Sequence, residues 1–442
     1  MQRIDFIGKQ IEKIDGQRRA NSRAKHQKML RSPFVFFRGT AQLFYTDAAD
    51  NVLNIPKAFS QLPLVCVMGD CHASNFGFLT EEGSHGDTVI FTPNDFDDAC
   101  VGHASWDILR FLTSLLLAGD HCRGVTQGEY QTDDNFDGKL AVNDHDIESA
   151  MRAFLDGYMV VCQNVAQSPN VINQAIDYEP EGKLAKYYKK ACRRAAGGRD
   201  FNIKSALAKA IELQQGRFKF REREDKFVKL DSATYSTLEH VFAPYMDDPI
   251  LDIVGRSNAG TGSVNMARYY FLIGPESQHD MQSFARCHIV EVKQQRLAAP
   301  LLYFRDLCPV NRLNPAHLTA RCQRKMQRRA DLLLDEVEWN DTHWLIRSRH
   351  HAKVGLDPED IGLGKKAVGQ SFADFARYCG MALALAHCRS DRRSTTFETA
   401  INDLLQAHQY DLIFEARNYF QQVLLDHKLF GEWVSHQAET NA

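Results

Sequence analysis

Apolar residues recur along this chain with two spacings, and each spacing predicts one kind of element. Short apolar and β-branched runs between polar turns predict strands. These runs lie at Leu64–Met68, Thr88–Thr92, Asp252–Val254, Ala267–Ile273, His288–Lys293 and Trp344–Arg349. The segment GFLTEEGSHGD lies between the first two runs, and its glycines and acidic residues suit a hairpin connection.

Longer segments carry apolar residues at helical spacing. Residues 1–32 place Ile4, Ile7, Ile11 and Ile14 on one face of a basic amphipathic helix, which Pro33 ends. Further helices are predicted at Trp106–Ala118, 143–165, 203–214, 317–336, Phe372–Cys388 and Ala400–Leu424. The chain therefore mixes helices and strands, and it contains no internal repeat.

Composition narrows the class of protein. A chain of 442 residues suits two or three domains, or one large two-lobed enzyme. Its 44% hydrophobic and 25% charged residues exclude wholesale disorder, a collagen-like repeat and a coiled-coil rod. The formal charge of −3 gives no global basic excess for nucleic acid. The basic stretch 183–229 also contains acidic residues, so a solvated surface is favoured there over a nucleic-acid patch.

The sequence predicts a cytoplasmic protein with no membrane partner. Its longest strongly apolar stretch, around Leu115–Ala118, is far shorter than the roughly 20 residues that span a bilayer. The polar N-terminus lacks the apolar core of a secretory signal. The eleven cysteines form no C-x-x-C pair, and their odd number and irregular spacing fit reduced thiols.

Residues suited to phosphate chemistry follow the first two predicted strands. Asp70 and Asn75 lie five residues apart in GDCHASNF, and Asp95 follows the next strand in NDFDDACVGHASWD. A hairpin would turn the chain back so that Asp95 faces the other two. Two carboxylates and an amide oxygen suit Mg²⁺, which keeps waters and shares ligands with phosphates. Phosphoryl transfer uses such parts, with one carboxylate acting on the acceptor hydroxyl.

A second group lies about 190 residues further along the chain. Gly255, Gly260, Gly262 and Ser263 belong to a glycine-rich turn, and Lys293 follows in VEVK, 31 residues after Gly262. Because glycine has no Cβ, backbone N–H groups in such a turn can approach phosphate oxygens. A lysine on a nearby strand can reach the α- and β-phosphates of a nucleotide. Taken singly, a tight hairpin and an edge-strand charge explain these residues equally well.

The spacing of the first group is more specific. The pattern is Asp70-x4-Asn75, then Asp95-Phe96-x-Asp98-Ala99, then Gly102 and Asp107. Over about 40 residues it resembles the catalytic core of aminoglycoside and choline phosphotransferases, which belong to the protein-kinase-like superfamily. The resemblance implies that Asp70 is the catalytic base and that Asn75 and Asp95 bind Mg²⁺. It implies structural support of the site by His72, Asp98 and Asp107.

Most of the chain also resembles the uncharacterised bacterial family called domain of unknown function 2252. The resembling segments are SPFVFFRGTA (32–41), GDCHASNFG (69–77), NDFDD (94–98), GTGSV (260–264), VEVK (290–293), LIRSRHHAKVG (345–355) and YCGMALALAHCRS (378–390). The family name supplies no activity and no acceptor.

The order of the motifs differs from that in ordinary kinases, where the glycine loop and lysine precede the catalytic loop. Moving residues 1–245 behind residue 390 would restore that order. The resemblance therefore implies an α+β, two-lobed, protein-kinase-like fold that is circularly permuted, which closely spaced termini would allow. The expected parts are a helical lobe (1–245, with 120–245 a variable helical insertion), a small antiparallel nucleotide-binding lobe (246–350) and C-terminal helices completing the helical lobe (351–442).

Kinase-like enzymes pair the strand lysine with a glutamate on the following helix. In this chain TARCQR puts Arg321 at the matching place. Direct pairing of Lys293 with Asp95 is the first alternative. Three further carboxylates could substitute, namely Asp331, Asp335 and Glu336. Like charges repel, so we expect Arg321 to point outward or to contact a phosphate or an acid.

The leading hypothesis is an ATP- and Mg²⁺-dependent phosphotransferase whose acceptor is a hydroxyl of a small molecule or a protein. The alternative is a nucleotide-binding, pseudokinase-like regulatory or scaffold protein. A metallophosphoesterase is disfavoured because its G-N-H ligand motif is absent from the sequence. A serine hydrolase is disfavoured because GTGSV does not match the G-x-S-x-G nucleophile elbow. Nucleic acid is not an expected partner.

Overall fold

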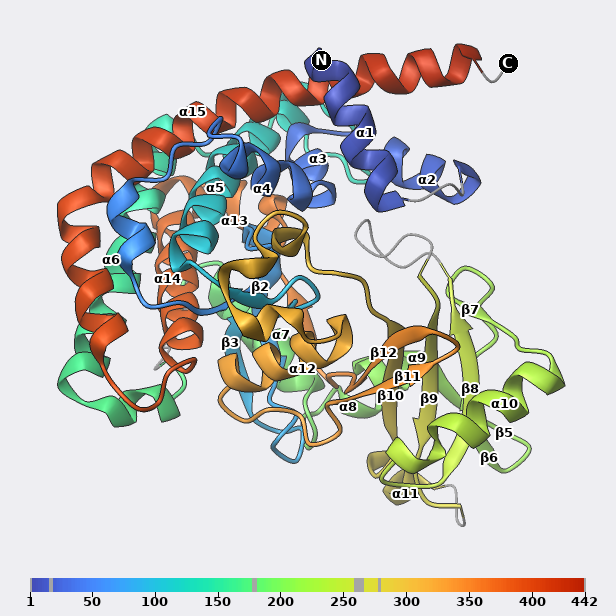
Figure 1. Cartoon of the computed structure of the whole chain (residues 1–442). Coiled ribbons are helices and arrows are strands. Elements are labelled where there is room, and N and C mark those ends of the chain that lie inside the picture. The colour runs from blue at the N-terminus through green and yellow to red at the C-terminus, as the bar shows by residue number, and fades with distance from the viewer. Residues whose placement is uncertain (1, 16–18, 177–180, 258–265, 277–279, 441–442) are drawn as a thin grey trace.

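The computed structural model describes residues 2–15, 19–176, 181–257, 266–276 and 280–440. The architecture is mixed α+β, with long helices gathered on one side and the largest sheet on the other (Figure 1). Strands β2 (Phe76–Thr80) and β3 (Val89–Pro93) lie between these two parts, whereas β5 (Ile211–Gln214) and β6 (Arg217–Phe220) lie beside the largest sheet. Among the described residues, no helix combines the length and the apolar character needed to cross a bilayer.

The largest sheet is antiparallel and has the order β11-β12-β10-β9-β8-β7. Its strands are β7 (Phe227–Val228), β8 (Ile250–Arg256), β9 (Arg268–Ile273), β10 (His288–Gln294), β11 (Asp335–Trp339) and β12 (Thr342–Ser348). Side chains alternate between the two faces of a strand. In β10, Val290 and Val292 therefore pack against α10 (Ser232–Phe242) on one face, while Glu291 and Lys293 point to the other. Helix α12 (Pro315–Met326) packs on β11 and β12 beside that polar face.

Long helices form the other part of the molecule. They are α5 (Ala104–Gln127), α6 (Asp144–Gln167), α14 (Phe372–Cys388) and α15 (Thr396–Thr440). Two glycines let α6 and α14 approach closely, because a Cβ on Gly380 would lie 2.0 Å from the carbonyl oxygen of Phe154. A Cβ on Gly157 would lie 2.4 Å from the carbonyl oxygen of Arg377.

The N-terminal helices pack against the C-terminal helix. Besides α1 (Arg3–Asp15) and α2 (Arg19–Met29), this region contains α3 (Pro33–Gly39) and α4 (Ala41–Ala49). Arg3 of α1 donates to Asp426 of α15 at 2.9 Å and to Asp47 of α4 at 2.6 Å. The first and last helices of the chain therefore lie side by side (Figure 1).

Short strands carry the first group of site residues. β1 (Val65–Val67) pairs with β4 (Cys100–Gly102), and β2 (Phe76–Thr80) lies between β3 (Val89–Pro93) and β13 (Lys353–Gly355). The hairpin expected to join the first two predicted strands begins instead at β2. The segment Phe76–Thr80 is itself apolar and buried, which explains why it forms a strand rather than a connection.

Three predicted helices differ from the structure. Residues 1–32 form α1 and α2, and Pro33 then begins α3 at its first helical position, where proline is tolerated. Residues 203–214 form α8 (Phe201–Lys204) and α9 (Ala206–Ala210), and β5 (Ile211–Gln214) then pairs with β6 (Arg217–Phe220). The turn between β5 and β6 has positive φ angles at Gln215 and Gly216, as a two-residue hairpin requires.

The predicted helix 317–336 is also too long. Helix α12 ends at Met326, and Asp335–Trp339 is strand β11. Asn340 and Asp341, both with positive φ, form the two-residue turn from β11 into β12. The remaining short helices are α7 (Leu184–Arg194), α11 (Met281–Ala285) and α13 (Pro358–Gly362).

Residues 201–245 pack with the large sheet, although the sequence groups them with the helical lobe. Phe201, Ile211 and Phe220 share a hydrophobic cluster with Tyr270 and other residues of β8 and β9. Helix α10 covers one face of the sheet, and β7 extends its edge. The core of the large sheet therefore includes residues that come before position 246 in the chain as well as after it, although the sequence predicts that the second lobe begins at 246.

Candidate active site

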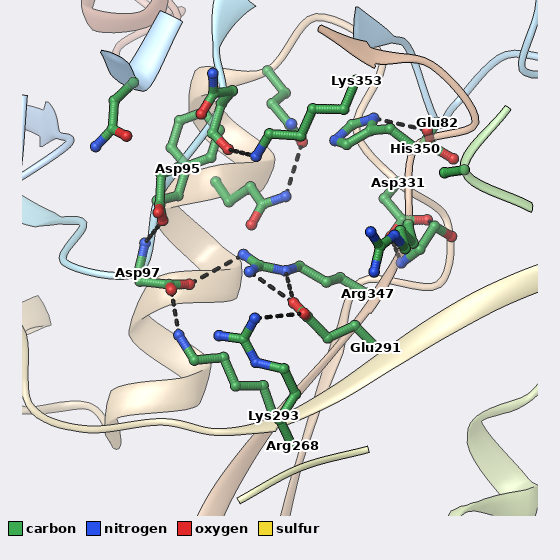
Figure 2. A pocket seen from close by; sticks show the side chains of 18 of the residues that line it. Glu82, Asp95, Asp97, Arg268, Glu291, Lys293, Asp331, Arg347, His350 and Lys353 are labelled. Carbon is green, nitrogen blue, oxygen red and sulfur yellow. Dashed lines mark hydrogen bonds and ion pairs between the residues drawn. The ribbon is translucent and has the colours of Figure 1, made fainter. Parts of the chain in front are cut away.

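A cleft of about 480 Å³ brings the first predicted group of residues together with Lys293 of the second. Asp70, Asn75 and Asp95 line it from the short strands, and Lys293 lines it from β10 of the large sheet. Figure 2 shows Asp95 and Lys293 on either side of Asp97. Residues about 200 positions apart in the sequence therefore form one site.

The loop after β1 is fixed by Asp107 and by a glycine. The fully buried carboxylate of Asp107 accepts hydrogen bonds from the backbone N–H of Met68 at 2.6 Å and of Gly69 at 3.1 Å. Gly69 has a φ of 74°, and a Cβ there would lie 1.9 Å from the carbonyl oxygen of Asp98. Only glycine fits this position, so the loop holds the next residue, Asp70, in one place.

Arg110 of α5 holds one oxygen of Asp70. Its Nε donates to Oδ1 at 3.0 Å, and its Nη2 donates to the same oxygen at 2.5 Å and to the carbonyl oxygen of Phe37 at 2.9 Å. The guanidinium is fully buried and lies 4.0 Å from the centre of the Phe37 ring. Oδ2 lies 3.8 Å from His72 Nε2, which is beyond hydrogen-bond distance, so Oδ2 is left for a ligand in the cleft.

The pKa of Asp70 suits a base that works near neutral pH. Burial raises the pKa to about 6, against the opposing effect of the Arg110 charge, and Asp98 and Asp95 raise it further. Such a carboxylate is ionised at pH 7 but still basic enough to accept a proton. Burial holds the pKa of His72 well below its usual range, so this imidazole is neutral and packs against Phe34.

Asn75 and Asp95 offer oxygen atoms to the cleft. Asn75 donates its Nδ2 to the carbonyl oxygen of Asp70 at 2.9 Å, which leaves its amide oxygen for another partner. Asp95 Oδ1 accepts from the backbone N–H of Asp97 at 3.1 Å. Among the described residues, no cationic nitrogen lies within 4 Å of the Asp95 carboxylate. Burial, together with the Asp97 charge, raises the pKa of Asp95.

These two residues fit Mg²⁺ only if other ligands join them. Within the described part of the chain, no group of three or more His, Cys, Asp or Glu side chains could hold a metal ion. Magnesium commonly binds through one or two protein carboxylates and takes its remaining ligands from phosphates and water. The donors present therefore suit a metal that arrives with a phosphate-bearing ligand.

Lys293 forms an ion pair with Asp97, not with Asp95 as expected. Asp97 Oδ1 also lies 3.1 Å from Arg347 Nη1, and Arg347 in turn donates its Nε to Glu291 at 2.9 Å (Figure 2). Arg268 extends this network to Glu291 at 3.1 Å. The register of β10 between β9 and β12 places Arg268, Glu291, Lys293 and Arg347 on one face of the sheet, whereas Asp97 comes from the loop between β3 and β4.

Lys293 is also more buried than expected. Only 1% of its surface is exposed, whereas a lysine facing a solvated cleft is expected from the sequence. Burial lowers its pKa, while Asp97 opposes that shift. The charges of Lys293 and Arg347 hold the pKa of Asp97 well below its usual range. Lys293 and Asp97 therefore form a charged pair in the cleft wall.

The other candidate carboxylates have different partners. Asp331 accepts from the backbone N–H and hydroxyl of Ser348, and Glu336 lies 2.9 Å from His317. Asp335 is exposed on β11. Arg321 is exposed on α12, which agrees with the expectation that it points outward. Gln323 of the same helix and Gln327, which follows its last residue, also line the cleft.

The remaining predicted residues have separate positions. Asp98 forms a bidentate ion pair with Arg296, both bonds 2.9 Å long, and accepts from the backbone N–H of Ala299. Gly255 is not in a loop but in β8, paired with Tyr269, because the strand continues to Arg256. Three residues of the predicted glycine turn lie outside the described residues: Gly260, Gly262 and Ser263.

Several residues in or beside the cleft belong to no recognisable sequence motif. Arg110 lies 40 positions after Asp70 within an apolar helix, and no spacing links the two. Arg347 and Glu291 alternate with apolar residues in WLIRSR and HIVEVK, which was a usable signal for a polar strand face. Asp97 occupies the unspecified position of the Asp95-Phe96-x-Asp98 pattern.

Comparison with known proteins identifies the family and nothing beyond it. The model of a family described as an uncharacterised protein conserved in bacteria, domain of unknown function 2252, matches residues 18–132 and 138–432. This match covers most of the chain, so the protein belongs to that family. No curated protein and no solved structure matched the chain.

Proposed function

Because membership of this family supplies no activity, we propose one from the chain's own residues: an ATP- and Mg²⁺-dependent phosphotransferase acting on a hydroxyl group. The observation that carries the proposal is the meeting of Asp70, Asn75 and Asp95 with Lys293 in one cleft. Lys293 contacts Asp97, and two residues of chain span at most about 7 Å. That spacing puts Lys293 and Asp95 within reach of one triphosphate.

Asp70 takes the role of general base in this proposal. Its Oδ1 is occupied by Arg110, so Oδ2 receives the proton of the acceptor hydroxyl as the new oxygen–phosphorus bond forms. At the same time the bond between the γ-phosphorus and the β,γ-bridging oxygen of ATP breaks, and ADP leaves. Asp107 keeps the loop from moving during this step, since it holds the two backbone N–H groups that precede Asp70. A positioned base of this kind contributes roughly 10²–10⁴-fold to a rate.

The donor would be bound from both sides of the cleft. Asn75 and Asp95 would hold Mg²⁺, which would neutralise phosphate charge and orient the transferred group. Lys293 and Arg347 supply cationic N–H groups on the facing sheet. In the structure both cations contact Asp97, so a bound triphosphate would compete with this carboxylate for them.

The same proposal includes a circularly permuted, kinase-like two-lobed fold. In support, the lysine-bearing sheet follows the catalytic loop in sequence yet faces it across the cleft. Helices α1 and α15 lie side by side, joined by the pair Arg3–Asp426, and a permutation requires that the first and last segments of a domain be neighbours.

Calorimetric titration with ATP, with and without Mg²⁺, tests donor binding. Wild-type protein should bind ATP more tightly with Mg²⁺, and Asp95→Ala should lose that dependence because it removes the charged ligand. Asp87→Ala, in the β2–β3 connection, removes an equal charge outside the cleft and should behave as wild type. Equal Mg²⁺ dependence in wild type and Asp95→Ala would contradict the assignment.

A nucleotide-binding protein without transfer activity is the second candidate. The engagement of Lys293 by Asp97 favours it, as does the outward position of Arg321 where active kinases carry a glutamate. This candidate predicts nucleotide binding with no release of phosphate under any condition, whereas the phosphotransferase predicts Mg²⁺-dependent turnover.

A further inference from the structure

One wall of the cleft carries four cations that the proposed chemistry does not use. Arg194 ends α7, Lys204 and Lys209 lie in α8 and α9, and Arg349 follows β12; all four line the cleft. We call these four residues the outer basic group. Three of them come from the basic stretch 183–229 and Arg349 comes from the end of β12, so the fold brings two separate parts of the chain together in the cleft.

The outer basic group lacks close counter-ions. No carboxylate of the described residues lies within 4 Å of Arg194, Lys209 or Arg349, and Lys204 has only Asp200 at 3.9 Å. Elsewhere in the cleft, Lys293, Arg347 and Arg296 have carboxylate partners, in the pairs Lys293–Asp97, Arg347–Glu291 and Arg296–Asp98. Lys353 donates only to the backbone carbonyl oxygen of Asn94, at 3.1 Å. Among the described residues, the outer basic group therefore holds most of the cleft cations that have no carboxylate partner.

These cations also repel one another. Burial lowers the pKa of Lys209, and the charges of Arg194, Lys190, Lys226 and Lys204 lower it further. Arg349 cannot easily move away, because its guanidinium lies 4.9 Å from the centre of the Tyr270 ring. An oxyanion placed among these side chains would relieve the repulsion and accept several charge-assisted hydrogen bonds.

The geometry separates this group from the reacting end of the cleft. Arg349 lies two residues beyond Arg347 at the end of β12, a step of roughly 7 Å on the same side of the strand. The charged groups that act most strongly on Asp70 are Arg110, Asp98 and Asp95, and none of them is among the groups that act most strongly on Lys209. A ligand that spans the cleft would thus meet a second set of cations beyond Arg347.

We propose that the outer basic group is a second oxyanion subsite, which binds a phosphate-type group separate from the one beside Asp95. The cleft then takes a substrate with two anionic groups, or two anionic substrates. The binding itself does not depend on the proposed transfer reaction, whereas naming its ligand as part of a phosphotransfer substrate rests on that function. The second anion belongs either to the nucleotide or to the acceptor.

The test uses inorganic pyrophosphate and Mg²⁺-ATP as probes, titrated calorimetrically at fixed ionic strength so that screening stays constant. The double variant Arg194→Gln, Lys209→Gln removes two cations of the subsite. Its matched control, Lys189→Gln with Arg193→Gln, removes two exposed cations of α7 that do not line the cleft. Circular dichroism checks that both variants are folded.

The double variant should bind pyrophosphate about tenfold or more weakly, as expected for lost hydrogen bonds to charged groups, and the control should match wild type. If Mg²⁺-ATP also weakens, the second anion is part of the nucleotide. If Mg²⁺-ATP binds unchanged, it belongs to the acceptor. Equal pyrophosphate affinity in all three proteins, or none at all in wild type, would overturn the proposal. Loss of turnover in Lys293→Met tests the transfer reaction separately.

Discussion

The buried pair Arg110–Asp70 gives the sharpest test of how the proposed base is tuned. Arg110→Met removes the guanidinium and keeps an unbranched apolar side chain between the rings of Phe37 and Phe44. The variant loses both hydrogen bonds to Asp70 Oδ1 and leaves the carboxylate without a partner cation. Both the turnover rate and the free energy of unfolding should change, because both depend on the charge of the Asp70 carboxylate.

The size of the effect follows from the burial of the pair. Removing one partner of a buried ion pair typically costs about 3–5 kcal/mol. Asp70 still contacts the cleft, so we take about 2 kcal/mol of this cost as the amount by which the ionised form of Asp70 is destabilised. One pKa unit corresponds to about 1.4 kcal/mol, so the pKa of Asp70 should rise from about 6 by roughly one to two units.

Stability should depend on pH with a defined sign. The pKa of Asp70 is raised in the folded state, so the native protein binds more protons than the unfolded chain above the unfolded value of about 3.9. This group therefore destabilises the protein as pH rises from about 4 to its folded pKa. In Arg110→Met the loss continues to a higher pH, so the fall in melting temperature relative to wild type should be larger at pH 8 than at pH 5.

The assay is the pH profile of ATP turnover. Wild-type activity should decline below about pH 6, and the acid limb of Arg110→Met should lie one to two units higher. Arg110→Lys, which keeps the charge, should shift less. Arg123→Met is the matched control, because Arg123 lies on the same helix but pairs with the exposed Asp144. A folded Arg110→Met protein with an unmoved acid limb would refute the assignment of Asp70.

Three further substitutions test other parts of the account. Lys293→Met should weaken Mg²⁺-ATP binding or cut turnover at least tenfold, since it removes a phosphate-facing cation; unchanged binding and turnover would count against its role. Asp107→Ala should lower the free energy of unfolding by about 3 kcal/mol, because two backbone N–H groups lose their partner in the buried loop; denaturant unfolding with a loss under about 0.5 kcal/mol would contradict the contact. Arg321→Glu should leave turnover unchanged and shift stability by less than about 0.5 kcal/mol, because the residue is exposed; increased transfer would mean that this position can restore an orienting acid.

Sequence spacing predicts the site best where the site residues lie close together along the chain. Asp70, Asn75 and Asp95 are close in sequence, and the strands around them correctly predict that they face one cleft. The strand positions of Lys293 and Arg347 follow from period-two alternation. Helix α14 was predicted with its observed bounds because its apolar pattern is long and uninterrupted.

Partners of buried charges could not be predicted in the same way. Asp95 and Asp97 lie two residues apart in one loop, and hydrophobic periodicity does not predict which of them forms the ion pair with Lys293. Arg110 meets Asp70 only because α5 packs beneath the loop, a tertiary contact without a sequence signal. The strands β5 and β11 are not predicted because the expected helices 203–214 and 317–336 run into them, and the two-residue turns that follow, Gln215-Gly216 and Asn340-Asp341, carry no strong turn signal.

The central claim is tested most directly by ³¹P NMR of Mg²⁺-ATP incubated with wild-type protein and with Asp70→Ala. Wild type should convert ATP to ADP, with the γ-phosphoryl group appearing as inorganic phosphate or on an added hydroxyl acceptor, and only when Mg²⁺ is present. Asp70→Ala should bind Mg²⁺-ATP as tightly as wild type while turning it over roughly 10²–10⁴-fold more slowly. An ATP signal that stays unchanged with wild type across a panel of hydroxyl acceptors, or equal turnover by both proteins, would contradict a phosphotransferase that uses Asp70 as its base.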